Sequence, residues 1–380
     1  MEQEVFRKDQ LDELTGMIRA IGAGKIFVVR GDRSFFASGA EAYVRMLTGG
    51  SDADSFHDFD PNPQLEDLTR GVEIFRNGNY DLILAIGGGS VLDMGKLISV
   101  FAHQESDITG IVTGKSKVKE IKTPLLAVPT TAGSGAEATK FAVLYIEKQK
   151  FSIEHPLVLP DYVYLFSGFT LSASPYLTAY TGLDAFCQAV ESAWSVNSNP
   201  ESEKFALRAI DLVWNHLQQA VDDGSAPAKE KMAEAAYLAG RAINITRTTA
   251  PHALSYAFTS YYNIPHGHAV ALSLPFFISF NHKVTNDSST DPRGPGSVKE
   301  RIEKVLDILK TGTGSAPALL ADFFNGIGIT MNPYDLIDGF DPQIIIDHVN
   351  MERLTNNPRI VTKKDILTFL QDQKNKSTHR

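Results

Sequence analysis

The chain has 380 residues, enough for about two or three domains of ordinary size, each with a buried core. Hydrophobic residues make up 43% and charged residues 21%, which is typical of folded proteins and excludes a disordered chain. The net charge of -9 argues against a nucleic-acid binder, and the most apolar stretch, 269–280, is too short to span a bilayer.

Cys187 is the only cysteine, so the chain can form no intramolecular disulfide and no cysteine-based zinc cluster. This fits a reducing compartment. The first residues lack the apolar core of a secretory signal. We therefore expect a cytoplasmic protein with neither a membrane nor a nucleic acid as partner.

Short apolar runs alternate with helical patterns over the first 170 residues. The runs that predict strands are 25–30, 55–59, 82–86 and 125–128. Between them, 64–77 places apolar residues at helical spacing. This alternation predicts a parallel sheet with helices on both faces, in an α/β nucleotide-binding domain over residues 1–170.

After about residue 170, strand patterns become scarce. Helical patterns cover 173–195, 200–222, 228–243, 251–262, 266–281, 298–310, 315–326 and the C-terminus. The segment 285–297 is polar and rich in Pro and Gly, which predicts a surface loop. We predict a second, all-α domain over residues 171–380.

A glycine-rich loop follows the predicted strand 82–86 and opens a helix. Its residues are Gly87, Gly88, Gly89 and Ser90. Glycines let the backbone approach a pyrophosphate, and the N–H groups at the helix start attract its charge. The loop matches neither G-x-G-x-x-G nor the P-loop, so a turn without a ligand is an alternative. Asp93 and Lys96, further along this helix, are either solvated charges or functional ones.

A second loop follows the predicted strand 125–128. It carries Thr130, Thr131 and Ser134 together with two glycines, and such hydroxyls can bind ribose or phosphate oxygens. Two loops of this kind at neighbouring strand ends favour a nucleotide site more than either loop does alone.

Metal-ligand residue types occur in the helical half. Asp184 and Gln188 are four residues apart, hence on one helix face, and His252 and His266 follow. A carboxylate, an amide oxygen and two imidazoles suit a divalent metal such as Fe²⁺, Zn²⁺, Mn²⁺ or Ni²⁺. Most lone helical histidines are merely hydrogen-bonded, so spacing alone favours a structural role for both.

Five motifs occur together along the chain. They are DFDPNP (58–63), GGGSVLDMGK (87–96), PTTAGSGAE (129–137), TGLDAFCQAVES (181–192) and HALSYAFTSYYNIPHGHAVAL (252–272). In this order they resemble the iron-containing (group III) alcohol dehydrogenase family, from about residue 20 to 280. The resemblance implies a dehydroquinate synthase-like architecture and an NAD(P)-dependent oxidoreductase, with Fe²⁺ as the first expectation for the metal.

The resemblance also implies roles for single residues. Asp184, His252 and His266 match metal ligands, and Gln188 would complete the set. The positions that match cofactor contacts are Gly88, Gly89, Ser90, Thr130, Thr131, Ser134 and Lys150. We also expect Gly31, Asn62, Gly87 and Asp93 to contact the cofactor.

Two positions depart from the family pattern. Gln188 stands where the family usually has His, and an amide oxygen is a weaker ligand than imidazole. Tyr256 replaces a further active-site His that lies four residues after the first histidine ligand. Its hydroxyl can donate a proton as part of the catalytic set, but it cannot act as an imidazole relay.

The runs 242–256 and 265–270 look like the branch that contains phosphonoacetaldehyde reductases. This implies reduction of phosphonoacetaldehyde to 2-hydroxyethylphosphonate in phosphonate metabolism. An anionic aldehyde needs cationic partners, and a guanidinium suits a phosphonate. Arg247 is the preferred anchor, with Arg241 and Asn244 as second choices, although each arginine could simply be solvated.

Cofactor choice depends on the residue after the first predicted strand. Relatives that prefer NAD tend to place Asp there, whereas this chain has Gly31, which leaves room for a 2′-phosphate near Arg30 or Arg33. Asp32 lies one residue later. We predict a preference for NADPH over NADH.

Other functions are open at this point. One is a reductase of uncharged short aldehydes or diols, and another is a dehydroquinate synthase or glycerol-1-phosphate dehydrogenase type of site. A third, suggested by Gln188 and Tyr256, is a binding protein whose metal site has decayed. Because relatives commonly dimerise, a homodimer is a further expectation.

Overall fold

The computed structural model describes residues 3–49, 51–105, 107–147, 149–349 and 351–377. The chain divides into two compact units, Met1–Ala173 and Ser174–Arg380. The domain boundary predicted after residue 170 lies within a few residues of this division, which follows Ala173. In the described ranges, no helix has the length and apolar character needed to cross a membrane.

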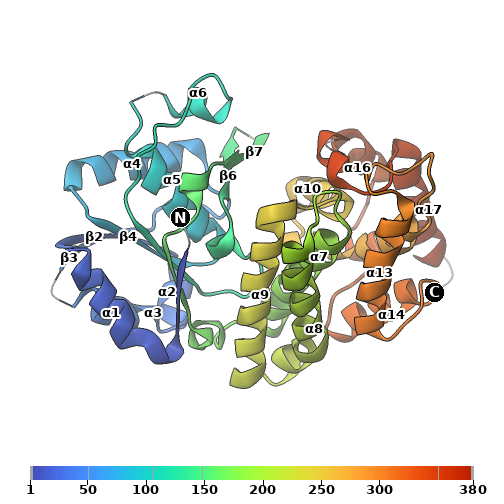
Figure 1. The fold of residues 1–380 in the computed structure, drawn as a ribbon, viewed down its shortest axis with the longest axis horizontal. Helices are drawn as coiled ribbons and strands as arrows, with labels where there is room; N and C mark the ends of the chain where they lie inside the picture. Colours follow the sequence, from blue (N-terminus) through green and yellow to red (C-terminus); the bar gives the residue numbers. More distant parts are fainter. Residues whose placement is uncertain (1–2, 50, 106, 148, 350, 378–380) are drawn as a thin grey trace. The chain divides into compact units, whose positions relative to one another are not determined.

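A six-stranded parallel sheet forms the centre of the first unit (Figure 1), in the order β1-β8-β5-β4-β2-β3. The strands are β1 (Glu4–Arg7), β2 (Lys25–Arg30), β3 (Asp52–Phe56), β4 (Leu82–Gly87), β5 (Leu125–Pro129) and β8 (Tyr162–Leu165). The predicted α/β class is confirmed. Strand order reverses between β2 and β4, and ligands of such sheets bind at the carboxyl ends of the strands beside that point.

Both faces of the sheet are covered by helices, which explains the unbroken apolar run of β4. Ile83 and Ala85 lie in one core, and Leu82, Leu84 and Ile86 lie in the other. The first core contains α4 (Leu65–Gly78), α5 (Gly89–Phe101) and α6 (Ile108–Val112), and the second contains α1 (Leu11–Ala20), α2 (Arg33–Ala37) and α3 (Ala40–Thr48) (Figure 1).

The prediction for the second strand was wrong in position. It lies at Asp52–Phe56 and not at 55–59, because it is an edge strand in which only Phe56 is buried and little apolar pattern marks it. The sequence pattern also missed β1, β8 and an antiparallel hairpin. That hairpin is formed by β6 (Phe141–Ile146) and β7 (Gln149–Glu154).

The second unit consists of helices, as predicted. They are α7 (Pro175–Trp194), α8 (Pro200–Asp222), α9 (Ala226–Thr246), α10 (Ala250–Tyr262), α11 (His266–Ala271), α12 (Leu274–His282), α13 (Pro295–Leu309), α14 (Ala316–Gly326), α15 (Pro333–Leu336), α16 (Pro342–His348) and α17 (Lys363–Ser377). The predicted helix 266–281 is in fact two helices. Pro275 lacks an N–H and occupies the first turn of α12, where none is needed.

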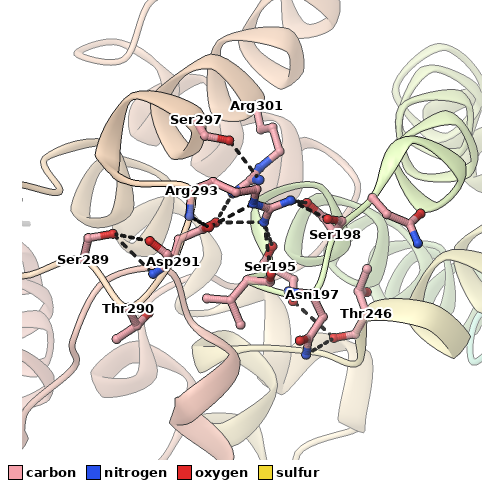
Figure 2. A network of polar contacts seen from close by, with 12 residues as sticks. Ser195, Asn197, Ser198, Thr246, Ser289, Thr290, Asp291, Arg293, Ser297 and Arg301 are labelled. Atoms are coloured by element: carbon pink, nitrogen blue, oxygen red, sulfur yellow. Dashed lines mark hydrogen bonds and ion pairs between the residues drawn. The ribbon is translucent and has the colours of Figure 1, made fainter.

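Helix α7 carries the first metal-ligand motif, and both of its ends are fixed. At its start the Ser174 hydroxyl accepts a hydrogen bond from the Leu177 amide, and Pro175 occupies the first turn. At its other end, the carbonyls of Ser195 and Val196 accept hydrogen bonds from the Arg293 guanidinium (Figure 2). The ligand-bearing helix is therefore restrained from both directions.

The segment 285–297 lies at the surface, as predicted, but it contains one buried residue, Asp291. Asp291 has a fully buried carboxylate, which accepts hydrogen bonds from Arg293 at 2.8 Å and from Arg301 at 2.5 Å (Figure 2). Burial raises the pKa of Asp291, but the two guanidiniums outweigh burial and lower it. The polar segment is therefore a clamp that joins the end of α7 to α13.

Replacing Asp291 with alanine would leave the buried guanidinium of Arg301 without its carboxylate. We expect Asp291→Ala to lower the free energy of unfolding by about 3 to 5 kcal/mol, measured by urea denaturation. Asp287→Ala, an exposed acid in the same segment, is the control and should change stability by less than about 0.5 kcal/mol. Equal stability of the two variants would contradict the clamp.

Candidate functional site

The two loops predicted to bind a nucleotide lie against each other in the first unit. Residues 87 and 129 are paired at the carboxyl ends of β4 and β5, and the Thr130 amide donates to the Gly87 carbonyl at 2.9 Å. A Cβ built on Gly88 would lie 3.5 Å from the Thr131 hydroxyl, and one on Gly89 would lie 2.8 Å from the Ser134 hydroxyl. The second loop thus approaches residue 89 closely, and a side chain there would have to displace the Ser134 hydroxyl.

Two more predicted cofactor positions lie at this edge of the sheet. Ser90 accepts a hydrogen bond from the Asn62 amide at 3.2 Å, and Asn62 itself has a φ of 70°. Gly31 follows directly after β2, the strand next to β4. The Arg30 guanidinium donates to the Gly31 carbonyl at 3.0 Å and packs over the ring of Phe35. The structure therefore places these positions at the edge where the order of the sheet reverses.

The charges on helix α5 are not solvated, so that alternative is wrong. Lys96 is fully buried, and its ammonium donates to the Thr139 hydroxyl at 2.9 Å and lies 3.7 Å from Asp93. Asp93 accepts a hydrogen bond from the backbone of β6, and the charge of Lys150 on β7 acts on it. Burial raises the pKa of Glu137, next to the second loop, to about 7. This buried cluster joins α5 to the hairpin that carries Lys150.

In the second unit, three of the four predicted metal ligands meet. Asp184 on α7, His252 on α10 and His266 at the start of α11 each offer one ligand atom, and these atoms lie within 4.8 Å of one another. His252 Nε2 lies 3.3 Å from Asp184 Oδ1, without the geometry of a hydrogen bond. A buried carboxylate oxygen with no hydrogen bond from the described residues, facing an imidazole nitrogen, is the arrangement that a metal ion fits.

Glu191 on α7 fixes the orientation of His252. Its carboxylate is fully buried and forms a very short contact with His252 Nδ1. The amide and hydroxyl of Thr249 donate to its second oxygen at 2.6 and 2.9 Å, and Trp194 donates to that hydroxyl. Because a carboxylate can only accept, Nδ1 holds the proton and Nε2 faces Asp184. This is the carboxylate–histidine–metal arrangement of protein metal sites.

The electrostatics of the cluster also suit a cation. Burial lowers the pKa of His252, but the charges of Glu191 and Asp184 outweigh burial and raise it to about 10. A positive charge is therefore strongly stabilised between the two carboxylates. A divalent cation would balance the same two carboxylate charges, and it would compete with a proton for His252 Nε2.

Gln188 lies one turn after Asp184 on the same helix, is buried, and hydrogen-bonds to the Asp184 side chain. The close approach of α11 to α7 depends on Gly267. A Cβ at this residue would lie 1.9 Å from the Tyr180 carbonyl oxygen and 2.9 Å from the Asp184 Cβ. Only glycine therefore lets His266 lie beside Asp184.

Tyr256, predicted to act in catalysis, lies against the ligand cluster. Its ring stacks on that of His266, with centroids 5.8 Å apart and planes at 11°. Its hydroxyl accepts a hydrogen bond from Arg353 at 3.0 Å. Arg353 belongs to the 3-10 helix η5 (Met351–Asn356).

The three predicted substrate residues lie on α9 or at its end, in different surroundings. Arg241 packs over the Phe205 ring and lies 3.8 Å from Glu201, so it is engaged with α8. Asn244 is half-buried. Arg247 is exposed, with φ 59° and ψ 178°, a conformation almost confined to glycine that costs about 1 to 3 kcal/mol. Strain of this kind is often found at functional sites.

Two residues of the site were missed from the sequence. Glu191 could have been found, because it is seven residues after Asp184 and lies on the same face of an otherwise apolar helix. Arg353 had no such signal, because only the fold brings it to Tyr256.

Two family profiles match the chain. Iron-containing alcohol dehydrogenase matches residues 2–166, and Fe-containing alcohol dehydrogenase family, C-terminal, matches residues 178–373. Phosphonoacetaldehyde reductase from Streptomyces viridochromogenes is 33% identical over 77% of this chain and 76% of its own length. Long-chain-alcohol dehydrogenase 1 from Geobacillus thermodenitrificans is 34% identical over 71% of this chain and 69% of its own.

A solved structure is similar over nearly the whole chain. It is the crystal structure of sulfoacetaldehyde reductase from Bifidobacterium kashiwanohense in complex with NAD⁺. The TM-score is 0.87 at 26% identity, over 98% of this chain and 96% of the other.

The role of Glu191 can be tested by removing its charge while keeping its shape. We expect Glu191→Gln to weaken metal affinity by about 10- to 100-fold, because His252 would lose the acceptor that holds Nε2 toward Asp184. Competition between the protein and a chelator for Zn²⁺ measures this affinity. Glu203→Gln, which removes an acid paired with Lys304 on another helix, should leave it unchanged. Unchanged affinity in Glu191→Gln would show that Glu191 serves packing alone.

Proposed function

Because the chain belongs to the iron-containing alcohol dehydrogenase family and is thus an oxidoreductase, we propose that it reduces a short aldehyde to a primary alcohol with NAD(P)H and a divalent metal. The finer proposal is reduction of phosphonoacetaldehyde to 2-hydroxyethylphosphonate. The observation that supports metal-dependent reduction is the convergence of Asp184, His252 and His266 from three helices. Glu191 lies behind His252.

In this proposal Asp184, His252, His266 and Gln188 hold the metal, and Fe²⁺ is preferred to Zn²⁺, Mn²⁺ or Ni²⁺ because of the family. When bound, a divalent metal polarises a carbonyl oxygen and stabilises the negative charge that develops there. Glu191 keeps the proton of His252 on Nδ1. The protein positions the reactants, and the hydride itself comes from the nicotinamide cofactor.

Tyr256 is proposed to supply the proton for the alcohol product. Its hydroxyl accepts a hydrogen bond from Arg353, a contact that favours donation of its own proton in another direction. Its ring lies on His266, so the hydroxyl is fixed relative to the ligand cluster. These contacts support a role in proton transfer without an imidazole at this position.

The cofactor is proposed to bind through the two loops at the ends of β4 and β5, with Lys150 and Asn62 nearby. A preference for NADPH is supported by Gly31 and by Arg30, whose guanidinium lies against the Gly31 carbonyl. The similar sulfoacetaldehyde reductase structure contains NAD⁺, which supports NADH as the alternative cofactor. A cytoplasmic location and a homodimer stay predictions.

The choice of an anionic substrate is supported by two similar proteins, whose names describe reductases of phosphonoacetaldehyde and sulfoacetaldehyde. The strained backbone of Arg247 adds an observation from the chain itself. A reductase of uncharged aldehydes is the second candidate, because the similar long-chain-alcohol dehydrogenase is 34% identical. A decayed metal site is disfavoured by the converging ligands.

The proposal is tested by a panel of aldehydes with NADPH and with NADH, after reconstitution with each of Fe²⁺, Zn²⁺, Mn²⁺ and Ni²⁺. We expect metal-dependent oxidation of NADPH, with the highest kcat/KM for phosphonoacetaldehyde and loss of activity on chelation. Absence of a stoichiometric metal, together with no turnover of any aldehyde, would favour a decayed site. A higher kcat/KM for propanal would favour the uncharged class.

Arg247 as phosphonate anchor makes a separate prediction. Arg247→Ala should raise the KM for phosphonoacetaldehyde by about 10- to 100-fold, the loss expected for charged hydrogen bonds to an oxyanion. Alanine keeps the Cβ, so the backbone strain is unchanged. The KM for propanal is the internal control and should change little. Equal increases for the two aldehydes would remove Arg247 from the substrate site.

A further inference from the structure

Arg353 is a cation held beside the candidate catalytic site by an aromatic residue. Its guanidinium carbon lies 4.9 Å from the centroid of the Tyr256 ring, and its terminal nitrogen donates to the Tyr256 hydroxyl at 3.0 Å. Tyr256 in turn stacks on His266. One aromatic ring therefore separates this guanidinium from a candidate metal ligand.

The segment that carries Arg353 is itself attached to the segment that leads into α10. Asn356, at the end of η5, donates to the Thr248 carbonyl at 3.4 Å, and its own carbonyl accepts a hydrogen bond from the Val196 amide at 3.2 Å. Thr248 is the neighbour of Arg247. These contacts hold η5 against the chain that carries both Arg247 and His252, so the position of Arg353 is fixed by the fold.

Arg353, like Arg359, packs on an aromatic ring and donates to an uncharged group, which distinguishes both from several other arginines of the unit. Four of them form ion pairs with carboxylates, and they are Arg208, Arg241, Arg293 and Arg301. Among the residues that the structure describes, no carboxylate pairs with Arg353, whose polar contact is the neutral Tyr256 hydroxyl. The net charge of the chain is -9, yet no carboxylate of the described residues balances the guanidinium of Arg353, so it can interact with an anionic ligand.

We propose that Arg353 binds the oxyanion group of the substrate, as a second cation in addition to the proposed anchor Arg247, and so contributes to a preference for aldehydes that carry a phosphonate or a sulfonate. This inference rests on the proposed function of the same site. A guanidinium has five N–H donors in a planar fork, and the contact with Tyr256 uses one nitrogen, which leaves donors to meet two oxyanion oxygens. The ring of Tyr256 orients the guanidinium, so little side-chain freedom is lost on binding.

The test compares Arg353→Met and Arg353→Lys with the unchanged holoenzyme. We expect Arg353→Met to lower kcat/KM by about 10- to 100-fold for phosphonoacetaldehyde and for sulfoacetaldehyde. The value for propanal should fall by a smaller factor, because loss of the contact with the Tyr256 hydroxyl acts on every aldehyde, whereas loss of the oxyanion contact acts on the anionic aldehydes alone. Arg353→Lys keeps the charge and should restore part of the loss. The ratio of kcat/KM for phosphonoacetaldehyde to kcat/KM for sulfoacetaldehyde shows which oxyanion is preferred.

A binding measurement separates this role from turnover. Calorimetric titration with 2-hydroxyethylphosphonate should give a Kd that is weaker in Arg353→Met by a similar factor. Arg208→Met is the matched control, since Arg208 pairs with Asp211 on the exposed face of α8, and both its kcat/KM ratio and its Kd should match those of the unchanged enzyme.

The outcomes distinguish the two proposals. If the unchanged enzyme reduces both anionic aldehydes, and Arg353→Met leaves the Kd and the ratio to propanal unchanged, this inference alone is overturned. Equal losses for propanal and for the anionic aldehydes in Arg353→Met would also overturn it, because Arg353 would then only support Tyr256. If the unchanged enzyme reduces propanal but neither anionic aldehyde, the proposed substrate and this inference both fail.

Discussion

A carboxylate removed entirely from water is stable only if donors or positive charge surround it, and the second unit is organised around such a group at Glu191. One of its oxygens meets His252, and the other meets the amide and hydroxyl of Thr249 just before α10. Meeting this need aligns α7 with the start of α10 and turns the imidazole toward Asp184. The same contacts that make the buried charge tolerable thus build half of the candidate metal site.

In the first unit, buried charged groups also hold together the elements around a candidate site, here the predicted nucleotide site. The sheet supplies parallel strand ends at one edge, and glycines let the Thr/Ser loop approach the start of α5. Behind this edge, the buried ammonium of Lys96 is held by Thr139 and Asp93, which joins α5 to the β6–β7 hairpin. Backbone and hydroxyl groups thus form the candidate nucleotide loops, while buried charges hold the supporting elements together.

Much of this could be predicted from the sequence, because the signals are local. The run into Gly87–Ser90 shows a strand, a turn and a helix within a few residues, and Asp184 and Gln188 share a helix face by spacing alone. Contacts between distant residues carry no local signal: Glu191 and His252 are 61 residues apart, and Arg353 and Tyr256 are 97 apart. Polarity correctly indicated that 285–297 lies at the surface, but composition could not show that Asp291 within it is buried and paired with Arg293 and Arg301.

The missing side chain at Gly267 has a consequence for attempts to alter this enzyme. The Tyr180 carbonyl occupies the space where a Cβ would be, so the residue at position 267 determines how closely α11 can approach α7. A substitution there would move His266 away from Asp184, so the proposed metal site would be disrupted although all its ligands remain. Libraries designed to change the metal or the aldehyde preference should therefore keep this glycine constant and vary the residues around Tyr256.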